Sequence, residues 1–302
     1  MYEAFYGFER PPFANVPDTS FFFPSSAHVE ALAQLTYAVE ARKGFAVLTG
    51  EVGAGKTTLT RALLRKLDPR TVTATVTNSR LTGVQLLLAV AKEFGIEDAK
   101  PNRVELLDRI NRFLIARLAE DRNVVLLIDE AQDLPLSTLE EVRLISNLET
   151  ETEKLVQILL IGQPELRDSV DHPSLRQLRQ RIAFRFHLKP LDQDQTREYV
   201  LHRLRVAGPL HGAKFTDKAL EAVWRYSGGV PRLINLVCDK ALLVGFTEDE
   251  KKIDQKTVLA GIREIEGPDW NFKSKSELAA ERGATAPRRT FLRLPFFGGR
   301  TT

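Results

Sequence analysis

The chain has 302 residues, of which 43% are hydrophobic and 27% are charged. These are ordinary proportions for a globular protein, and the length is typical of about two domains. The single cysteine, Cys238, excludes an internal disulfide and a cysteine metal cluster, and it indicates a reducing compartment.

The net charge of +3 comes from 43 basic and 40 acidic residues. Residues 268–302 hold seven Lys/Arg against three Asp/Glu, so the rest of the chain is close to neutral. We find no apolar run of about 18 residues and therefore expect no membrane-spanning helix. The acidic, aromatic N-terminus does not resemble a secretory signal, so we expect a cytoplasmic protein, with peripheral contact at the inner membrane as a variant of that expectation.

The first part of the chain predicts an aromatic segment, a helix and a strand. Residues 1–25 are rich in Phe, Tyr and Pro without a clean period, and we expect them to pack on the body as a strap. A helix is predicted from about 27 to 42, with Ser25 or Ser26 as its cap. The apolar run 45–49 predicts a strand, and leucines at helical spacing predict a helix over 59–67.

Between that strand and that helix lies a glycine-rich turn, GEVGAGKTT. Its spacing is that of a phosphate-binding loop, in which backbone N–H groups and the following helix N-terminus hold phosphates. The alternative is a glycine-rich turn without a ligand. In the phosphate-binding interpretation Lys56 reaches the β- and γ-phosphates and the Thr57 hydroxyl ligates Mg²⁺. The predicted nucleotide-binding residues are Gly50, Glu51, Val52, Gly53, Ala54, Gly55, Lys56, Thr57 and Thr58.

Four more strands are predicted further along, interleaved with helices. They are 72–77, 124–128, 155–161 and 183–188, with helices that include one ended by Gly95, one capped by Asn102 and a basic one around 174–181. This order predicts an α/β domain over 26–190, a P-loop NTPase fold with a five-stranded parallel sheet between two helical layers.

Beyond this domain the pattern predicts helices only. Four of them would form a small C-terminal all-α lid domain over 191–266. Residues 267–302 lack periodicity and are predicted to be a flexible basic tail. Within it, FLRLPFF (291–297) is either a docking segment or a solvated stretch with chance aromatics.

Candidate catalytic residues follow the predicted strands. Asp129 and Glu130 come directly after the buried strand 124–128, where parallel sheets place their sites. Asp129 is predicted to hold Mg²⁺, and Glu130 to polarise the water that attacks the γ-phosphate. Gln163 follows strand 155–161 and is expected to hydrogen-bond that water or the γ-phosphate, with a turn residue that satisfies local backbone as the alternative.

Two arginines complete the candidates. The basic helix offers Arg181, with Arg179 as the substitute, as an arginine that crosses to a neighbouring subunit's nucleotide; a solvated basic helix is the alternative. Arg232 follows Pro231 at a predicted helix start and is expected to lean toward the phosphates, unless the Pro-Arg pair is merely a structural start. Adenine recognition is not fixed by spacing, and Phe13, Tyr6 and the helix 27–42 are the candidates.

Taken together, GEVGAGKT, LLIDEAQ, Gln163 and GVPR resemble an AAA+ ATPase. The opening, MYEAFYGFERPPF followed by PDTSFFFPSSAHVEALAQLTYAVEARKGFAVLTG, resembles the general secretion pathway protein A (ExeA-like) ATPases, related to pilus-biogenesis and exosortase-associated ATPases. More distantly it is similar to the transposition regulators TnsC and MuB and to origin-recognition initiators. The resemblance covers roughly residues 1–266.

The resemblance implies ATP and Mg²⁺ as cofactors, Asp129 and Glu130 as the Walker B pair, Gln163 as sensor 1 and Arg232 as sensor 2. It also implies self-assembly into a ring or filament with ATP at subunit interfaces. The secretion member carries a membrane-spanning segment and a peptidoglycan-binding region after the ATPase, and neither is evident here, so we expect an ATPase that acts through partners.

Three functions remain open from the sequence. The first is an ATPase that serves envelope machinery for secretion, pili or exopolysaccharide export, through a protein partner that the sequence does not identify. The second is a DNA-binding ATPase of the transposition-regulator or initiator kind, in which basic residues of 176–185 and 197–205 contact phosphates. The third is a nucleotide-dependent scaffold without turnover, against which Glu130 argues.

Overall fold

The computed structural model describes the chain except for residues 17, 78–79, 98–99, 152, 209–211 and 268–302. Residues 1–262 form one unit, and the described part of the second unit is the end of the last helix. The predicted tail, with its candidate docking segment 291–297, lies outside the described residues apart from Gly267.

Five parallel strands form the central sheet, in the order β2-β3-β4-β1-β5. This confirms the predicted five-stranded parallel sheet. The strands are β1 (Phe45–Gly50), β2 (Val72–Val76), β3 (Val124–Ile128), β4 (Gln157–Gly162) and β5 (Phe184–Leu188). The central three, β3, β4 and β1, are buried along their whole length, as their continuous apolar sequences require.

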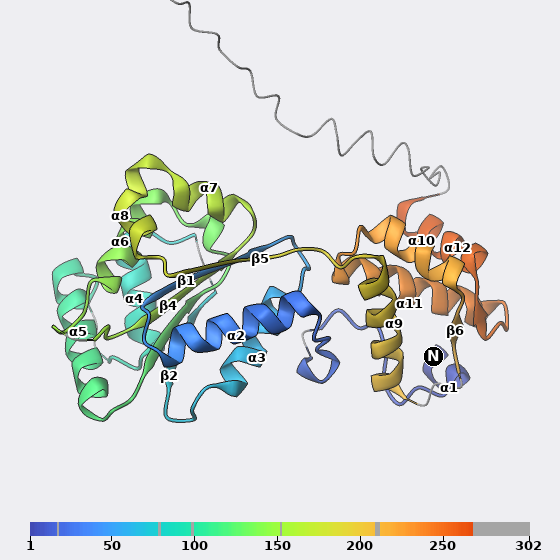
Figure 1. Ribbon diagram of the computed structural model, residues 1–302, viewed down its shortest axis with the longest axis horizontal. Coiled ribbons are helices and arrows are strands. Elements are labelled where there is room, and N and C mark those ends of the chain that lie inside the picture. The colour runs from blue at the N-terminus through green and yellow to red at the C-terminus, as the bar shows by residue number, and fades with distance from the viewer. Residues whose placement is uncertain (17, 78–79, 98–99, 152, 209–211, 268–302) are drawn as a thin grey trace, which may run out of the picture. The chain divides into compact units, whose positions relative to one another are not determined.

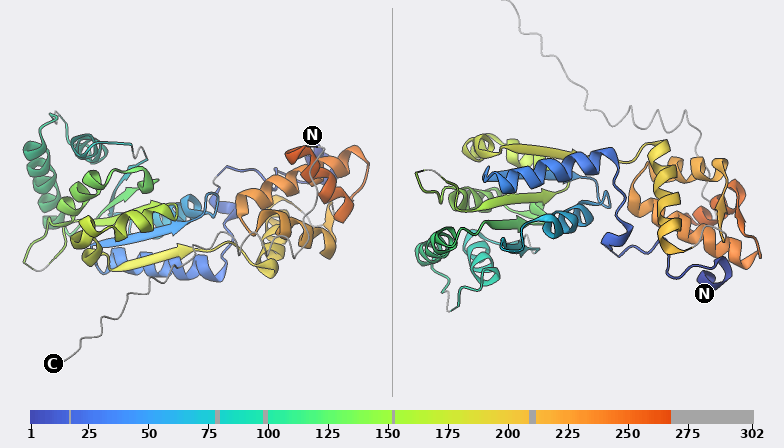
Figure 2. Two further views of the ribbon diagram at one scale, coloured as in Figure 1. Left: turned by 90° about the horizontal axis from the view of Figure 1, so that it is seen from above. Right: turned by 60° about the horizontal axis from the view of Figure 1, so that its bottom comes forward.

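Helices cover both faces of this sheet (Figures 1 and 2). Alternate residues of each strand face opposite layers: Val47 and Leu126 pack with one cluster of helices, and Leu48 and Leu127 with the other. One layer contains α2 (Ser26–Glu40) and α3 (Lys56–Lys66). The other contains α4 (Gly83–Glu93), α5 (Arg103–Ala119), α6 (Leu136–Ser146), α7 (Glu165–Asp171) and α8 (Arg176–Arg181).

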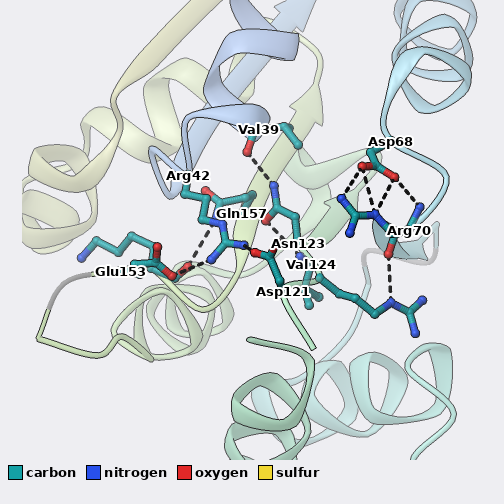
Figure 3. Close-up of polar contacts among 11 residues, drawn as sticks. Val39, Arg42, Asp68, Arg70, Asp121, Asn123, Val124, Glu153 and Gln157 are labelled. Carbon is teal, nitrogen blue, oxygen red and sulfur yellow. Dashed lines mark hydrogen bonds and ion pairs between the residues drawn. The ribbon is translucent and has the colours of Figure 1, made fainter. Parts of the chain in front are cut away.

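At the amino ends of the strands, polar contacts connect the turns (Figure 3). The Arg42 guanidinium pairs with Glu153 at 2.6 Å and with Asp121 at 3.4 Å. The Asn123 side-chain amide donates to the Val39 carbonyl at 2.7 Å. Arg42 and Asp121 both adopt a left-handed backbone, with φ of 48° and 52°. Tight turns therefore close this end of the sheet, and the carboxyl ends of the strands are left for the site.

The C-terminal region is helical, as predicted. It consists of α9 (Gln193–Ala207), α10 (Asp217–Ser227), α11 (Pro231–Thr247) and α12 (Gln255–Glu266). The expectation of helices only was incomplete, because a short parallel ladder joins β6 (Lys214–Phe215) to β7 (Lys252–Ile253). Each strand has two residues, which is too short to produce a periodic sequence signal.

A tight backbone contact connects the start of α9 to the turn between α10 and α11. The Leu191 N–H donates to the Gly229 carbonyl at 2.9 Å. Gly229 has φ of 82°, and a Cβ on it would lie 1.8 Å from the Leu191 carbonyl oxygen. Only glycine fits this contact, so the approach of these two segments depends on residue 229.

Residues 1–25 pack against α9 and α11. They include the short helix α1 (Tyr2–Tyr6) and a 3₁₀ turn, η1 (Thr19–Phe21). The Tyr6 hydroxyl hydrogen-bonds the Leu242 and Glu250 carbonyls, each at 3.1 Å. Buried Arg203 of α9 donates to the Pro12 and Ala14 carbonyls at 2.5 and 3.1 Å. The aromatic strap is therefore held by hydrogen bonds as well as by its rings.

The contacts of Arg203 correct one expectation. The stretch 197–205 was considered as a basic surface for nucleic-acid phosphates, but Arg203 is buried and Arg197 pairs with Asp217 at 3.1 Å. Arg203 is thus removed from that surface, whereas Arg197 and Arg205 are exposed on it.

Candidate functional site

The glycine-rich loop connects β1 to α3 and bends at two glycines. Gly53 and Gly55 have φ of 79° and 97°, conformations that glycine adopts without strain. Gly55 occupies the position before α3, so no side chain caps the first-turn N–H groups of this helix. Free N–H groups and the positive end of the helix dipole make such a terminus suited to an anion.

Lys56, the first residue of α3, is buried within the loop. Its ammonium donates to the Gly50 and Glu51 carbonyls at 2.8 and 3.0 Å. Burial lowers the pKa of Lys56, whereas the negative charges of Glu130 and Asp129 act in the opposite direction. The loop lysine and the two carboxylates after β3 therefore belong to one electrostatic site.

Asp129 and Glu130 directly follow β3. The Asp129 N–H donates to the Val76 carbonyl of β2 at 2.9 Å, which extends the sheet to this residue. Burial raises the pKa of Asp129, with the neighbouring Glu130 adding to the rise. Glu130 is exposed and has a left-handed backbone, with φ of 51°. The turn thus separates one half-buried carboxylate from one that projects into solvent.

Gln163, after β4, lies beside these carboxylates. Its side-chain amide donates to Glu130 Oε2 at 3.4 Å. A second glutamine, Gln132, donates to the same oxygen at 2.8 Å and accepts from the Gln163 backbone N–H at 3.0 Å. The sequence singled out Gln163 but assigned no role to Gln132, although it stands in the same Asp-Glu-Ala-Gln stretch.

A cavity of about 340 Å³ brings these parts together. It is lined by most of the loop, by Glu130 after β3 and Gln163 after β4, and by residues of the strap and of α9 and α11. The lining residues are Ala14, Asn15, Val16, Val52, Gly53, Gly55, Lys56, Thr57, Thr58, Glu130, Gln163, Tyr199, Arg203, Pro231, Arg232 and Asn235. The other predicted loop residues, Gly50, Glu51 and Ala54, belong to the same turn, and Asp129 adjoins Glu130.

Arg232 enters this cavity from the start of α11. Its backbone N–H donates to the Gly53 carbonyl at 3.3 Å. A Cβ on Gly53 would lie 2.5 Å from the Arg232 Cβ, so the helix begins directly against the glycine-rich loop. This places the predicted sensor arginine next to the loop.

Arg181 does not line the cavity. Its positive charge contributes to the lowered pKa of Lys154, after burial. The Lys154 side chain lies against Gly44, at the amino end of β1, so Arg181 is at the opposite end of the sheet from the loop. In the described part of the chain, Arg176, Arg179 and Arg181 make no ion pair. A role toward a neighbouring subunit remains a prediction.

The two aromatic candidates for adenine recognition do not line the cavity, because Tyr6 and Phe13 are buried elsewhere. Helix α2 contributes His28 to a smaller adjoining cavity of about 60 Å³. His28 Nδ1 is 2.7 Å from Ser25 Oγ, and a Cβ on Gly55 would lie 3.0 Å from His28 Nε2, so the ring lies against the loop. The sequence indicated the Ser25 cap but not this contact with the loop.

The described residues suit a divalent metal bound together with phosphates. They contain no group of three or more His, Cys, Asp or Glu side chains arranged to hold a metal ion alone. Mg²⁺ in nucleotide sites is commonly bound by one or two carboxylates plus phosphate oxygens. Asp129 offers such a carboxylate, and Thr57, which carries a hydroxyl, is among the residues that line the cavity.

In the part of the chain that is described, no helix has the length and apolarity needed to cross a membrane.

The family model described as AAA domain matches residues 39–170. Over 268 residues the chain is 45% identical to General secretion pathway protein A of Aeromonas hydrophila, covering 88% of this chain and 49% of that protein. The chain thus spans about half the length of this relative.

Solved structures of similar fold include the Aeropyrum pernix ORC2 protein in ADPNP-ADP complexes, with a TM-score of 0.64, 16% identity, and coverage of 90% of this chain and 75% of that one. The Drosophila ORC bound to DNA gives a TM-score of 0.63 at 17% identity, with coverage of 92% and 67%. At such identities the likeness concerns the fold alone. From the family match, the P-loop sheet and the relative together, the chain contains an AAA domain that includes residues 39–170 and is similar to general secretion pathway protein A along most of its own length.

Proposed function

We propose that this chain is a Mg²⁺-dependent ATP hydrolase of the AAA+ type. The observation that carries the proposal is the convergence of the glycine-rich loop, Asp129, Glu130 and Gln163 at the carboxyl ends of three neighbouring strands. A site that only binds nucleotide needs the loop and a metal carboxylate. An exposed second carboxylate beside a polar amide suits hydrolysis as well.

In this proposal each side chain has a separate task. Lys56 binds the β- and γ-phosphates, and Thr57 and Asp129 would hold Mg²⁺. The bound metal would neutralise negative charge on the phosphate oxygens. Glu130 accepts a proton from the attacking water, and Gln163 orients that water or the γ-phosphate. Arg232, on α11 next to Gly53, contacts the phosphates and links nucleotide binding to the C-terminal helices.

We further propose that the chain assembles with copies of itself and that Arg181, or Arg179 beside it, completes a neighbour's site. The positions of Arg179 and Arg181 far from their own loop, without ion pairs among the described residues, support a role in trans. The 45% identity to general secretion pathway protein A supports a cytoplasmic role in bacterial envelope machinery, through a partner protein.

The test compares ATP binding with ATP turnover in wild type and Glu130→Gln. We expect the variant to bind ATP with wild-type affinity while turnover falls by at least about 100-fold, because general-base catalysis contributes roughly 10²–10⁴-fold. Asp133→Asn, an exposed substitution in the same turn, is the matched control and should change neither quantity. Normal hydrolysis by Glu130→Gln would refute the assignment of this residue.

A further inference from the structure

Gln132 contacts two separate parts of the site with the two ends of one amide. It lies in η2 (Ala131–Asp133), the turn that follows Glu130. Its Nε2 donates to Glu130 Oε2 at 2.8 Å, and its Oε1 accepts from the Gln163 N–H at 3.0 Å. One side chain therefore connects the end of β3 to the end of β4.

Glu130 depends on such a contact for its orientation. Its side chain is exposed, and in the described residues only the Gln132 and Gln163 amides donate hydrogen bonds to its carboxylate. The Gln163 bond is long, at 3.4 Å, and this amide must turn to the γ-phosphate or the water to do its proposed work. Gln132 is then the amide that continues to hold Glu130.

A glycine at the end of β4 leaves room for the Gln132 amide. Gly162 is the last residue of β4, and a Cβ on it would lie 2.7 Å from Gln132 Oε1 and 2.9 Å from Leu166 Cδ2. A side chain at position 162 would push the amide away from the Gln163 N–H. Because Gly162 has no side chain, the Gln132 amide has room at the end of β4.

We propose that Gln132 is the positioning residue that aims the Glu130 carboxylate and couples its place to that of Gln163. The inference rests on the proposed hydrolytic function. An amide is required at position 132 because it must donate to Glu130 at one end and accept from Gln163 at the other. A carboxylate fails at the first contact, since it would lie against another carboxylate.

The test uses Gln132→Met, which keeps the length without hydrogen bonds, and Gln132→Glu, which keeps the shape without the donor. We expect both variants to keep the wild-type midpoint of thermal unfolding. Their ATP affinity, measured with a fluorescent ATP analogue, should stay within about twofold of wild type. Turnover should fall by about 10- to 100-fold, the cost of a misplaced catalytic group. Asp133→Asn is the control in the same turn.

A double variant separates positioning from general structural damage. With Glu130→Gln already present, adding Gln132→Met should lower turnover no further, because the group that Gln132 aims is gone. Wild-type turnover in Gln132→Met, a joint loss of affinity and stability, or additive losses in the double variant would each overturn the inference while the ATPase proposal stands. A wild-type protein that binds ATP without hydrolysing it would refute both.

Discussion

Arg203 should be a principal anchor of the N-terminal strap, and its replacement by methionine should destabilise the protein strongly. The buried guanidinium donates to the Pro12 and Ala14 carbonyls and to the Tyr199 hydroxyl, and it lies 4.5 Å from the centre of the Phe21 ring. Arg203→Met removes every donor but keeps most of the apolar stem.

The size of the effect follows from the groups left behind. A buried polar group that loses its partner costs about 1–3 kcal/mol, so the two strap carbonyls together predict a loss of about 2–6 kcal/mol. At roughly 2–4 °C per kcal/mol for a domain of this size, the midpoint of thermal unfolding should fall by about 4–24 °C. Because Asn15 and Arg203 both line the cavity, ATP affinity should fall too.

The assay is thermal unfolding followed by circular dichroism, with limited proteolysis to report release of residues 1–25. Arg205→Met is the matched control, because Arg205 is exposed on the same helix and, among the described residues, its side chain donates only to the Leu201 carbonyl of that helix. This control should change stability by less than about 0.5 kcal/mol. If Arg203→Met unfolds within about 2 °C of wild type, the strap is not held in the way described.

Four further predictions concern the loop and the subunit contacts. Gly53→Ala should abolish nucleotide binding, since its Cβ would meet Arg232 at 2.5 Å in a left-handed backbone; retained affinity in a titration would contradict this. Burial lowers the pKa of His28, so the unfolded chain takes up its proton more readily, and stability should fall as the pH drops below about 6.5. His28→Gln should show a shallower fall in melting temperature over that range, and an unchanged slope would exclude His28 as a cause. Mixing inactive Lys56→Ala with inactive Arg181→Ala should restore turnover if Arg181 acts on a neighbour, and a mixture that stays inactive would count against that role. Chelation of divalent cations with EDTA should abolish hydrolysis and excess Mg²⁺ should restore it; turnover that persists in EDTA would remove the metal from the mechanism.

The centre of the sheet could be predicted because β1, β3 and β4 are buried on both faces. A continuous run such as VVLLI (124–128) signals such a strand, and parallel order then follows from the interleaved helices. Helix starts at Ser25 and Asn102 were also predictable, since each side chain accepts from a backbone N–H two or three residues ahead. These signals are local in sequence.

The contacts that were missed depend on distant segments. Gln132 matters only because β3 and β4 lie side by side and bring Gln163 within 3.0 Å of it. Arg203 reads as one more basic residue on a helix until the strap folds over it. The five-residue helix α1 and the α7 helix are short, and short elements give little periodicity to recognise.

The contact between Leu191 and Gly229 ties the start of α9 to the turn between α10 and α11. Leu191 lies three residues beyond Leu188, which is paired with Gly50 at the end of β1. A swing about residues 189–191 would carry α9 and the α10–α11 turn as a rigid body, and Arg232 would travel with that turn. The angle of the C-terminal helices and the reach of Arg232 toward a phosphate would then vary as a single mechanical coordinate.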